Sequence, residues 1–148
     1  MRVICSFGEN NEPPDAWKKF YAYKQLVLSA CLFAQGKTEQ GWEMFDAAMH
    51  YYRSVHESKQ EFLCAGGVLF SNLRINHNWT FACDGAGVRY ELPGLREYSY
   101  ASPRKIETLL SDPRYVWFDS VREKARYRAA LLWVRDERKK EDAMRNME

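Results

Sequence analysis

Apolar residues fall on alternate positions between residues 69 and 92, and turn-forming residues divide this stretch into three segments. Alternation with a period of two is typical of strands that bury one face of a sheet. Asn76–Asn78 and Asp84–Gly87 are rich in residues that favour turns, and Pro93 ends the pattern. The sequence therefore predicts an antiparallel β-meander of three strands over about 68–92.

The length of the first predicted loop decides which residues face each other. A three-residue loop at 76–78 places Leu73 opposite Phe81 and puts the odd-numbered side chains on the apolar face. Residues 58–67 are predicted to be a connection, and the β-rich segment 2–7 is a candidate fourth strand. A small sheet is unstable with its apolar face in water, so we expect helices to cover it.

Helical spacing of apolar residues precedes the predicted sheet and predicts a helical hairpin over about 15–57. Its two helices, about 15–35 and 39–57, are separated by Gly36, and Asp15 and Thr38 are candidate N-caps. The spacing of the small and apolar residues resembles that of one tetratricopeptide repeat unit: Leu28, Ser29, Leu32, Gly36, Gly41, Phe45 and Ala48. Such repeats need neighbouring copies, and the chain has no second copy, so we interpret the unit as a helix pair packed through small residues.

Two Pro-containing start signals follow the sheet and predict C-terminal helices over about 103–143. Ser102 and Pro103 are a typical N-cap and first-turn pair for a short helix to about Leu110. Asp112 and Pro113 repeat the signal and predict the start of the last helix. Its inward-facing residues are expected to be Tyr115, Phe118, Val121, Ala125, Ala129 and Leu132. The predicted fold is one α+β domain over 1–148, with hairpin, meander and C-terminal helices around one core.

Composition adds an excess of aromatic residues to this picture. The chain has 148 residues and a formal charge of +2, and 15% of the residues are aromatic, which is more than a core of this size requires. Four widely spaced cysteines, without a metal-binding or CxxC motif, are expected to be free buried thiols: Cys5, Cys31, Cys64 and Cys83. Without a secretory signal or a membrane-spanning run, the sequence predicts a cytoplasmic protein that does not enter membranes.

The sequence gives only weak support for a catalytic site. Asp46 and His50 would share a helix face, but a polar stripe opposite an apolar stripe is typical of any surface helix. His77 and Cys83 would lie about 20 Å apart along the predicted hairpin, too far for a nucleophile and its base. Gly36–Thr38 resembles the end of a phosphate-binding loop but lacks that loop's first glycine. No catalytic residue, metal or cofactor is therefore predicted, and a small enzyme is the third hypothesis.

Exposed aromatic and arginine residues favour a protein-interaction module, such as an adaptor, inhibitor or immunity-type protein. The partner is expected to be another protein, and a homo-oligomer is a further alternative. The predicted contact residues are Tyr98, Tyr100, Arg114, Tyr115 and Trp117, with Arg74 and Arg89 as a second choice.

Nucleic-acid binding is the alternative function, because arginines interleaved with aromatics contact phosphates and stacked bases. Its candidate residues lie on the predicted last helix: Arg122, Arg126, Arg128 and Trp133. Acidic residues interrupt this series, and such a mixture of charges is more often an ordinary helix with intrahelical ion pairs.

Overall fold

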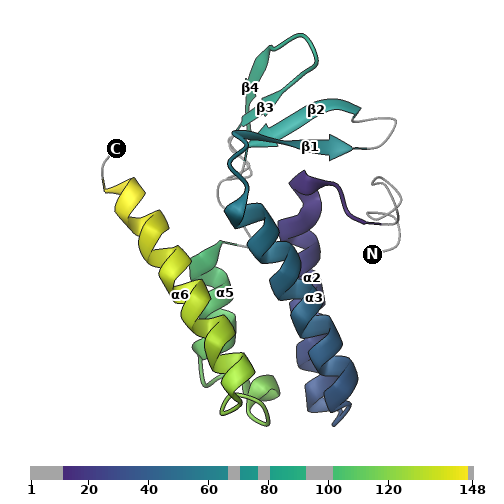
Figure 1. The fold of residues 1–148 in the computed structure, drawn as a ribbon, viewed down its shortest axis with the longest axis vertical. Coiled ribbons are helices and arrows are strands. Elements are labelled where there is room, and N and C mark those ends of the chain that lie inside the picture. The colour runs from purple at the N-terminus through teal and green to yellow at the C-terminus, as the bar shows by residue number, and fades with distance from the viewer. Residues whose placement is uncertain (1–11, 67–70, 77–80, 93–101, 147–148) are drawn as a thin grey trace. The chain divides into compact units, whose positions relative to one another are not determined.

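The structure is a computed structural model, and it describes residues 12–66, 71–76, 81–92 and 102–146. Helices α2 (Asp15–Ala34) and α3 (Thr38–Glu57) come first and are followed by four strands. The strands are β1 (Phe62–Gly66), β2 (Ser71–Asn76), β3 (Phe81–Cys83) and β4 (Arg89–Glu91). Helix α5 (Pro103–Ser111), the 3₁₀ helix η3 (Val116–Phe118) and helix α6 (Ala125–Arg145) complete the described part (Figure 1). The predicted α+β class, helical hairpin and meander are confirmed.

The chain divides into two compact units, and each long N-terminal helix contributes to both. The boundary falls between Ala22 and Tyr23 in α2, and between Met49 and His50 in α3. The first unit therefore holds the start of α2, the end of α3 and the sheet, and the second holds the rest of the hairpin with α5, η3 and α6. The proposal of one domain over 1–148 stays a prediction.

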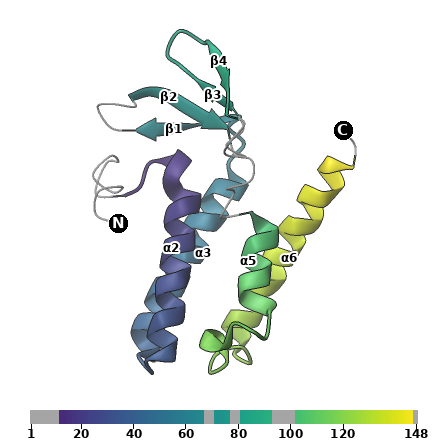
Figure 2. The same ribbon diagram turned by 180° about the vertical axis from the view of Figure 1, so that it is seen from behind.

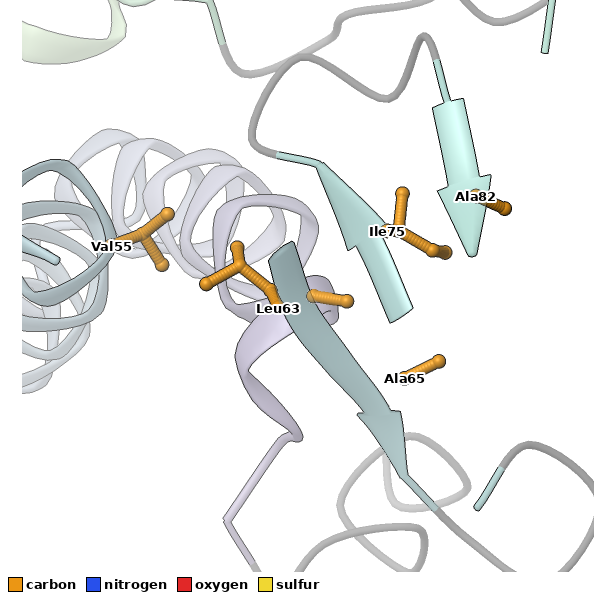
Figure 3. Packing of buried hydrophobic residues seen from close by; sticks show 6 residues of the cluster. Val55, Leu63, Ala65, Ile75 and Ala82 are labelled. Carbon is orange, nitrogen blue, oxygen red and sulfur yellow. The ribbon is translucent and has the colours of Figure 1, made fainter. Parts of the chain in front are cut away.

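The first unit buries one face of the sheet against the two helices. Leu63 and Ala65 of β1 join Ile75 and Ala82 in a cluster with Val55 of α3 (Figure 3). The Trp17 indole N–H of α2 donates a hydrogen bond to the Ala65 carbonyl, 2.9 Å away. Trp17 thus covers the cluster with its ring while its polar atom pairs with the edge strand.

The sheet has the strand order β1-β2-β3-β4, with every neighbouring pair antiparallel. Strand β1 lies in the segment 58–67 that we predicted to be a connection, so that prediction is wrong. The alternation of apolar residues in β1 rests on Leu63 and Ala65 alone. Two residues are too few to identify a strand by its pattern. The candidate strand at 2–7 lies outside the described residues.

The predicted register between β2 and β3 is also wrong. Arg74 pairs with Cys83 and Ile75 with Ala82, so the strands are shifted from the predicted pairing of Leu73 with Phe81. The shift is by an odd number of residues, which turns the opposite face of β3 toward the core. Ala82 is buried, whereas Phe81 and Cys83 lie on the outward face.

Asp84 holds the turn between β3 and β4, as its position beside Gly85 predicted. Its Oδ1 atom accepts hydrogen bonds from the backbone N–H groups of Ala86 and Val88, each at 2.9 Å. The Tyr90 hydroxyl donates to Oδ2, also at 2.9 Å. The bond from Val88 and the bond from Tyr90 lower the pKa of the Asp84 carboxyl, because both favour its charged form.

The second unit contains the closed end of the helical hairpin. Gly36, at φ +72°, ends α2 with a left-handed residue, and the Lys37 N–H reaches back to the Leu32 carbonyl at 2.9 Å. Gly41 lies so close to the Phe33 ring that a Cβ atom would stand 2.6 Å from it. The helices therefore pack closely through this glycine. Helices α2 and α3 lie side by side (Figure 2).

The C-terminal helices begin only partly where the sequence predicted. The Ser102 hydroxyl caps α5 by accepting from the Lys105 N–H, and Pro103 opens the helix, as expected. Asp112 and Pro113 do not start the last helix: Asp112 is the C-cap of α5, and α6 begins at Ala125. The later start changes which side chains of α6 are buried.

The buried residues of α6 are Tyr127, Ala130 and Val134, at helical spacing. Phe118 and Val121 are buried as predicted, but they belong to η3 and the turn after it. Ala125 and Ala129 are exposed, and 59% of Leu132 is exposed, so the predicted inward face of the last helix is wrong over its helical part.

Cysteine burial also differs from the expectation. Cys31 and Cys64 are exposed and Cys83 is half-buried, and all three are free thiols. Cys5 lies outside the described residues.

Candidate functional site

The segment between α5 and α6 presents a group of exposed aromatic and apolar side chains. The rings of Tyr115 and Trp117 stack with their centroids 5.4 Å apart and an angle of 28° between their planes. Trp117 is 44% exposed and Val116 is 60% exposed. We call residues 112–119 the α5–α6 loop. Two of its large apolar side chains, Val116 and Trp117, are exposed and lie outside the core.

Arg122 holds the backbone of this loop in place through hydrogen bonds. Its Nη1 atom donates to the Leu110 carbonyl at 2.7 Å, and Nη2 donates to the carbonyls of Asp112 at 2.9 Å and Tyr115 at 2.6 Å. Its Nε atom donates to the Asp119 carboxylate at 2.9 Å, and only 20% of the Arg122 side chain is exposed. The guanidinium therefore satisfies the last carbonyls of α5 and ties three points of the loop together.

Phe118 anchors the same loop in the aromatic core of the second unit. Its side chain is fully buried, and its ring centroid lies 5.5 Å from that of Tyr127 and 6.4 Å from that of Phe45. The Tyr127 hydroxyl donates to the Leu110 carbonyl at 2.8 Å, beside the bond from Arg122. Burial raises the pKa of the Tyr127 hydroxyl well above its usual value, so this hydroxyl stays a donor.

Arg114 lies at the start of the loop and pairs with Asp112. Its Nε and Nη2 atoms reach the carboxylate at 3.0 and 2.5 Å, and its backbone N–H donates to Oδ1 at 2.9 Å. The side-chain and backbone bonds from Arg114 lower the pKa of Asp112 to about 2. Arg114 nevertheless remains mostly exposed, with 82% of its side chain open to solvent.

Three of the five predicted contact residues therefore lie together in one ordered loop: Arg114, Tyr115 and Trp117. Tyr98 and Tyr100 lie outside the described residues. The residue that sequence reasoning missed is Arg122, which we assigned to the nucleic-acid alternative. A signal existed, because α5 ends without the left-handed glycine that usually lets backbone N–H groups bond the last carbonyls of a helix, so a side-chain donor was a candidate for that role.

The residues predicted to contact nucleic acid do not form one such group, and their arginines are engaged in ion pairs. Arg126 pairs with Asp46 of α3, and its guanidinium carbon lies 4.7 Å from the centroid of the Trp42 ring. Arg128 pairs with Glu123. Trp133 is half-buried in α6. Each of the three candidate arginines thus already has a carboxylate partner, which reduces the charge that it offers to a phosphate.

The described residues of the catalytic alternative, Asp46 and His50, each contact other residues. The Asp46 carboxylate accepts from Arg126, and the His50 ring lies edge-on to Tyr51, with centroids 5.5 Å apart. His77 lies outside the described residues. Within the described ranges, no group of three or more His, Cys, Asp or Glu residues is arranged to hold a metal ion.

Comparison with protein-family models, with curated proteins and with solved structures returns no match.

Among the helices of the described residues, none combines the length and the apolar character needed to cross a bilayer.

Proposed function

We propose that the protein is a non-enzymatic protein-interaction module that contacts its partner through the α5–α6 loop. The observation that carries the proposal is the exposure of Val116 and Trp117, beside the half-buried Tyr115, on a backbone that Arg122 holds in place. A preorganised loop loses little conformational freedom on binding, so more of the contact free energy appears as affinity. Tyr and Trp are also among the residues that contribute most to protein interfaces.

The chemistry of the loop favours a partner with an apolar pocket and an acidic rim. Trp117 and Val116 supply the apolar contact, and Arg114 supplies a mostly exposed guanidinium beside it. The partner is a second protein or a second copy of this chain. The free thiols of Cys31, Cys64 and Cys83 support a reducing, cytoplasmic setting for this contact.

Site-specific photo-crosslinking in cells that naturally produce the protein tests this proposal. A photoreactive amino acid at Val116 is expected to give one discrete crosslinked product. The same amino acid at Lys124, an exposed position outside the loop, is the matched control and is expected to give none. Trp117→Ala in the Val116 variant should remove the product, because the main apolar anchor is lost.

The mass of the product tells a partner protein from a second copy of the chain. Equal labelling from Val116 and Lys124, or a product that persists after Trp117→Ala, would contradict the proposal.

A further inference from the structure

The outward face of the sheet carries a second arrangement of arginine and aromatic residues, in the first unit. Leu63 and Ala65 of β1 point into the cluster, so Phe62 and Cys64 lie on the opposite face. The register aligns Cys64 with Arg74, Arg74 with Cys83, and Cys83 with Arg89. We call these four residues the arginine row. It crosses all four strands, a span of about 14 Å at the usual strand spacing.

A second row of outward residues lies beside the arginine row. Phe62 aligns with Asn76, and Phe81 aligns with Glu91. We call these four residues the phenylalanine row. Both phenylalanines are half-buried although they lie on the outward face. Arg89 connects the two rows, because it extends from the arginine row over the phenylalanine rings.

The Arg89 guanidinium covers these rings closely. Its central carbon lies 4.3 Å from the centroid of Phe81 and 5.7 Å from the centroid of Phe62. Both distances are within the range of a cation–π contact. Arg89 itself is exposed, so a planar group can stack on the guanidinium, or on the rings beside it.

The neighbours of Arg74 make it accessible as well. Arg74 is exposed, and its partners on both sides are the short side chains of Cys64 and Cys83. The carboxylate in the two rows is Glu91, at the end of the phenylalanine row. Phosphate groups are therefore attracted to the arginine row and repelled from the Glu91 end of the phenylalanine row.

We propose that this face of the sheet binds single-stranded nucleic acid, with phosphates along the arginine row and bases stacked over Phe62, Phe81 and Arg89. Stacking on aromatic rings and guanidinium planes is tolerant of base identity, so the site takes a strand with little sequence preference. The carboxylate side chains of an acidic peptide satisfy the arginines but do not provide the aromatic bases that stack on rings. The combination of charge and stacking selects nucleotides.

Fluorescence anisotropy with a labelled oligouridine of about twelve nucleotides tests the proposal on the full chain. Phe81→Leu keeps an apolar side chain but removes the aromatic ring, and it should weaken binding about tenfold. Arg89→Gln should weaken binding by a similar factor, because it removes a stacking plane and a charge.

The logarithm of affinity falls as the logarithm of salt concentration rises, and Arg74→Gln should reduce the magnitude of this negative slope by about 0.7, measured between about 50 and 200 mM salt. Glu91→Gln should raise the affinity, because it removes the repulsion of phosphate.

Lys124→Gln is the matched control, since it removes one exposed positive charge from the second unit and should leave the affinity unchanged within about twofold. Circular dichroism of each variant checks that the fold is intact.

Several results would overturn the proposal. They are no binding by the unaltered protein, equal weakening by Lys124→Gln, or loss of binding only with Arg128→Gln on α6. Uridine monophosphate binding as tightly as the oligonucleotide would assign the face to a small ligand. Equal competition by polyglutamate would assign it to an acidic protein.

Discussion

Arginine and aromatic side chains meet in two regions of this molecule, and the guanidinium faces different groups in each. In the α5–α6 loop, Arg122 points its donors at backbone carbonyls and leaves Trp117 uncovered. On the outward face of the sheet, Arg89 lies on the rings of Phe62 and Phe81. Arg122 therefore has a structural role, because it supports the loop that carries the aromatic side chains. Arg89 is instead part of the exposed surface.

The comparison shows why residue type alone does not assign a role. Arg122 is 20% exposed and forms its bonds mostly with the backbone, whereas Arg89 is exposed and contacts side chains. Loss of the first should change the shape and stability of the loop. Loss of the second should change binding and leave the fold in place.

Among the arginine substitutions, the largest expected effect on stability comes from Arg122→Ala. The substitution leaves carbonyls of Leu110, Asp112 and Tyr115 without their charged donor. We expect the free energy of unfolding to fall by about 3 kcal/mol, because hydrogen bonds to charged groups contribute about 1.5–3 kcal/mol each and are not additive. Urea unfolding measures this change.

Arg128→Ala is the control for the loss of an arginine from an exposed ion pair, and it should cost about 0–1 kcal/mol. Equal losses in the two variants would contradict the structural role of Arg122.

A smaller effect concerns the protonation of Asp112. Its folded-state pKa is lowered from 3.8 to about 2, with the hydrogen bond from Arg114 as the largest cause. A lowered pKa adds stability above the unfolded-state value, and this contribution is lost as the pH falls from about 4 to about 2. The carboxyl resonance of Asp112, followed by NMR, should titrate near 2.

In Arg114→Gln the Asp112 midpoint should move upward toward 3.8, because the hydrogen bond from Arg114 is the largest cause of the lowered pKa. An unchanged Asp112 midpoint would show that Arg114 does not hold the carboxylate in solution.

The smallest expected effect on stability comes from Trp117→Ala. Trp117 is 44% exposed, and its ring contact is with Tyr115 in the same loop. We expect the free energy of unfolding to change by less than about 1 kcal/mol, since exposed positions away from the core tolerate substitution. Phe118→Ala, one residue further, should cost about 3–5 kcal/mol because its ring is fully buried. Similar losses for both would show that Trp117 supports the fold.

The helical hairpin could be predicted because its signals are local. Helical spacing on both sides of Gly36 and the left-handed turn at that residue are properties of a short stretch of chain. The Ser102–Pro103 start of α5 is local in the same way. Asp112–Pro113 carries a similar signal, an N-capping residue followed by Pro, but the Asp112 carboxylate accepts from the Arg114 N–H in a turn, and Asp112 is the C-cap of α5.

The register of the sheet could not be predicted, because the alternation continues across the loop. Residues 77–80 separate β2 from β3, and an even number of residues there places Ile75 opposite Ala82. A loop with an odd number leaves odd positions opposite odd positions. The sequence pattern is the same in both cases, and only the pairing reveals that Phe81 and Arg89 share the outward face.

In the candidate sites too, contacts between residues close in sequence could be predicted, and contacts between distant segments could not. Arg114, Tyr115 and Trp117 are neighbours in sequence, so their proximity could be predicted. The contact of Arg89 with Phe62 joins β4 to β1 and depends on the whole sheet. The carbonyls that Arg122 binds become close to it only when the chain turns between α5 and α6.

Three of the four hydrogen bonds from Arg122 end on backbone carbonyl oxygens, which every amino acid provides, and the fourth ends on the Asp119 carboxylate. The contacts that Arg122 makes with the α5–α6 loop therefore do not involve the side chains at positions 114, 116 and 117. Under the proposed function, substitutions at these positions are expected to exchange one binding specificity for another while the Arg122 contacts keep the loop in place. The loop is in this sense an evolvable surface, and a library randomised at these three positions is a direct way to select binders for new targets.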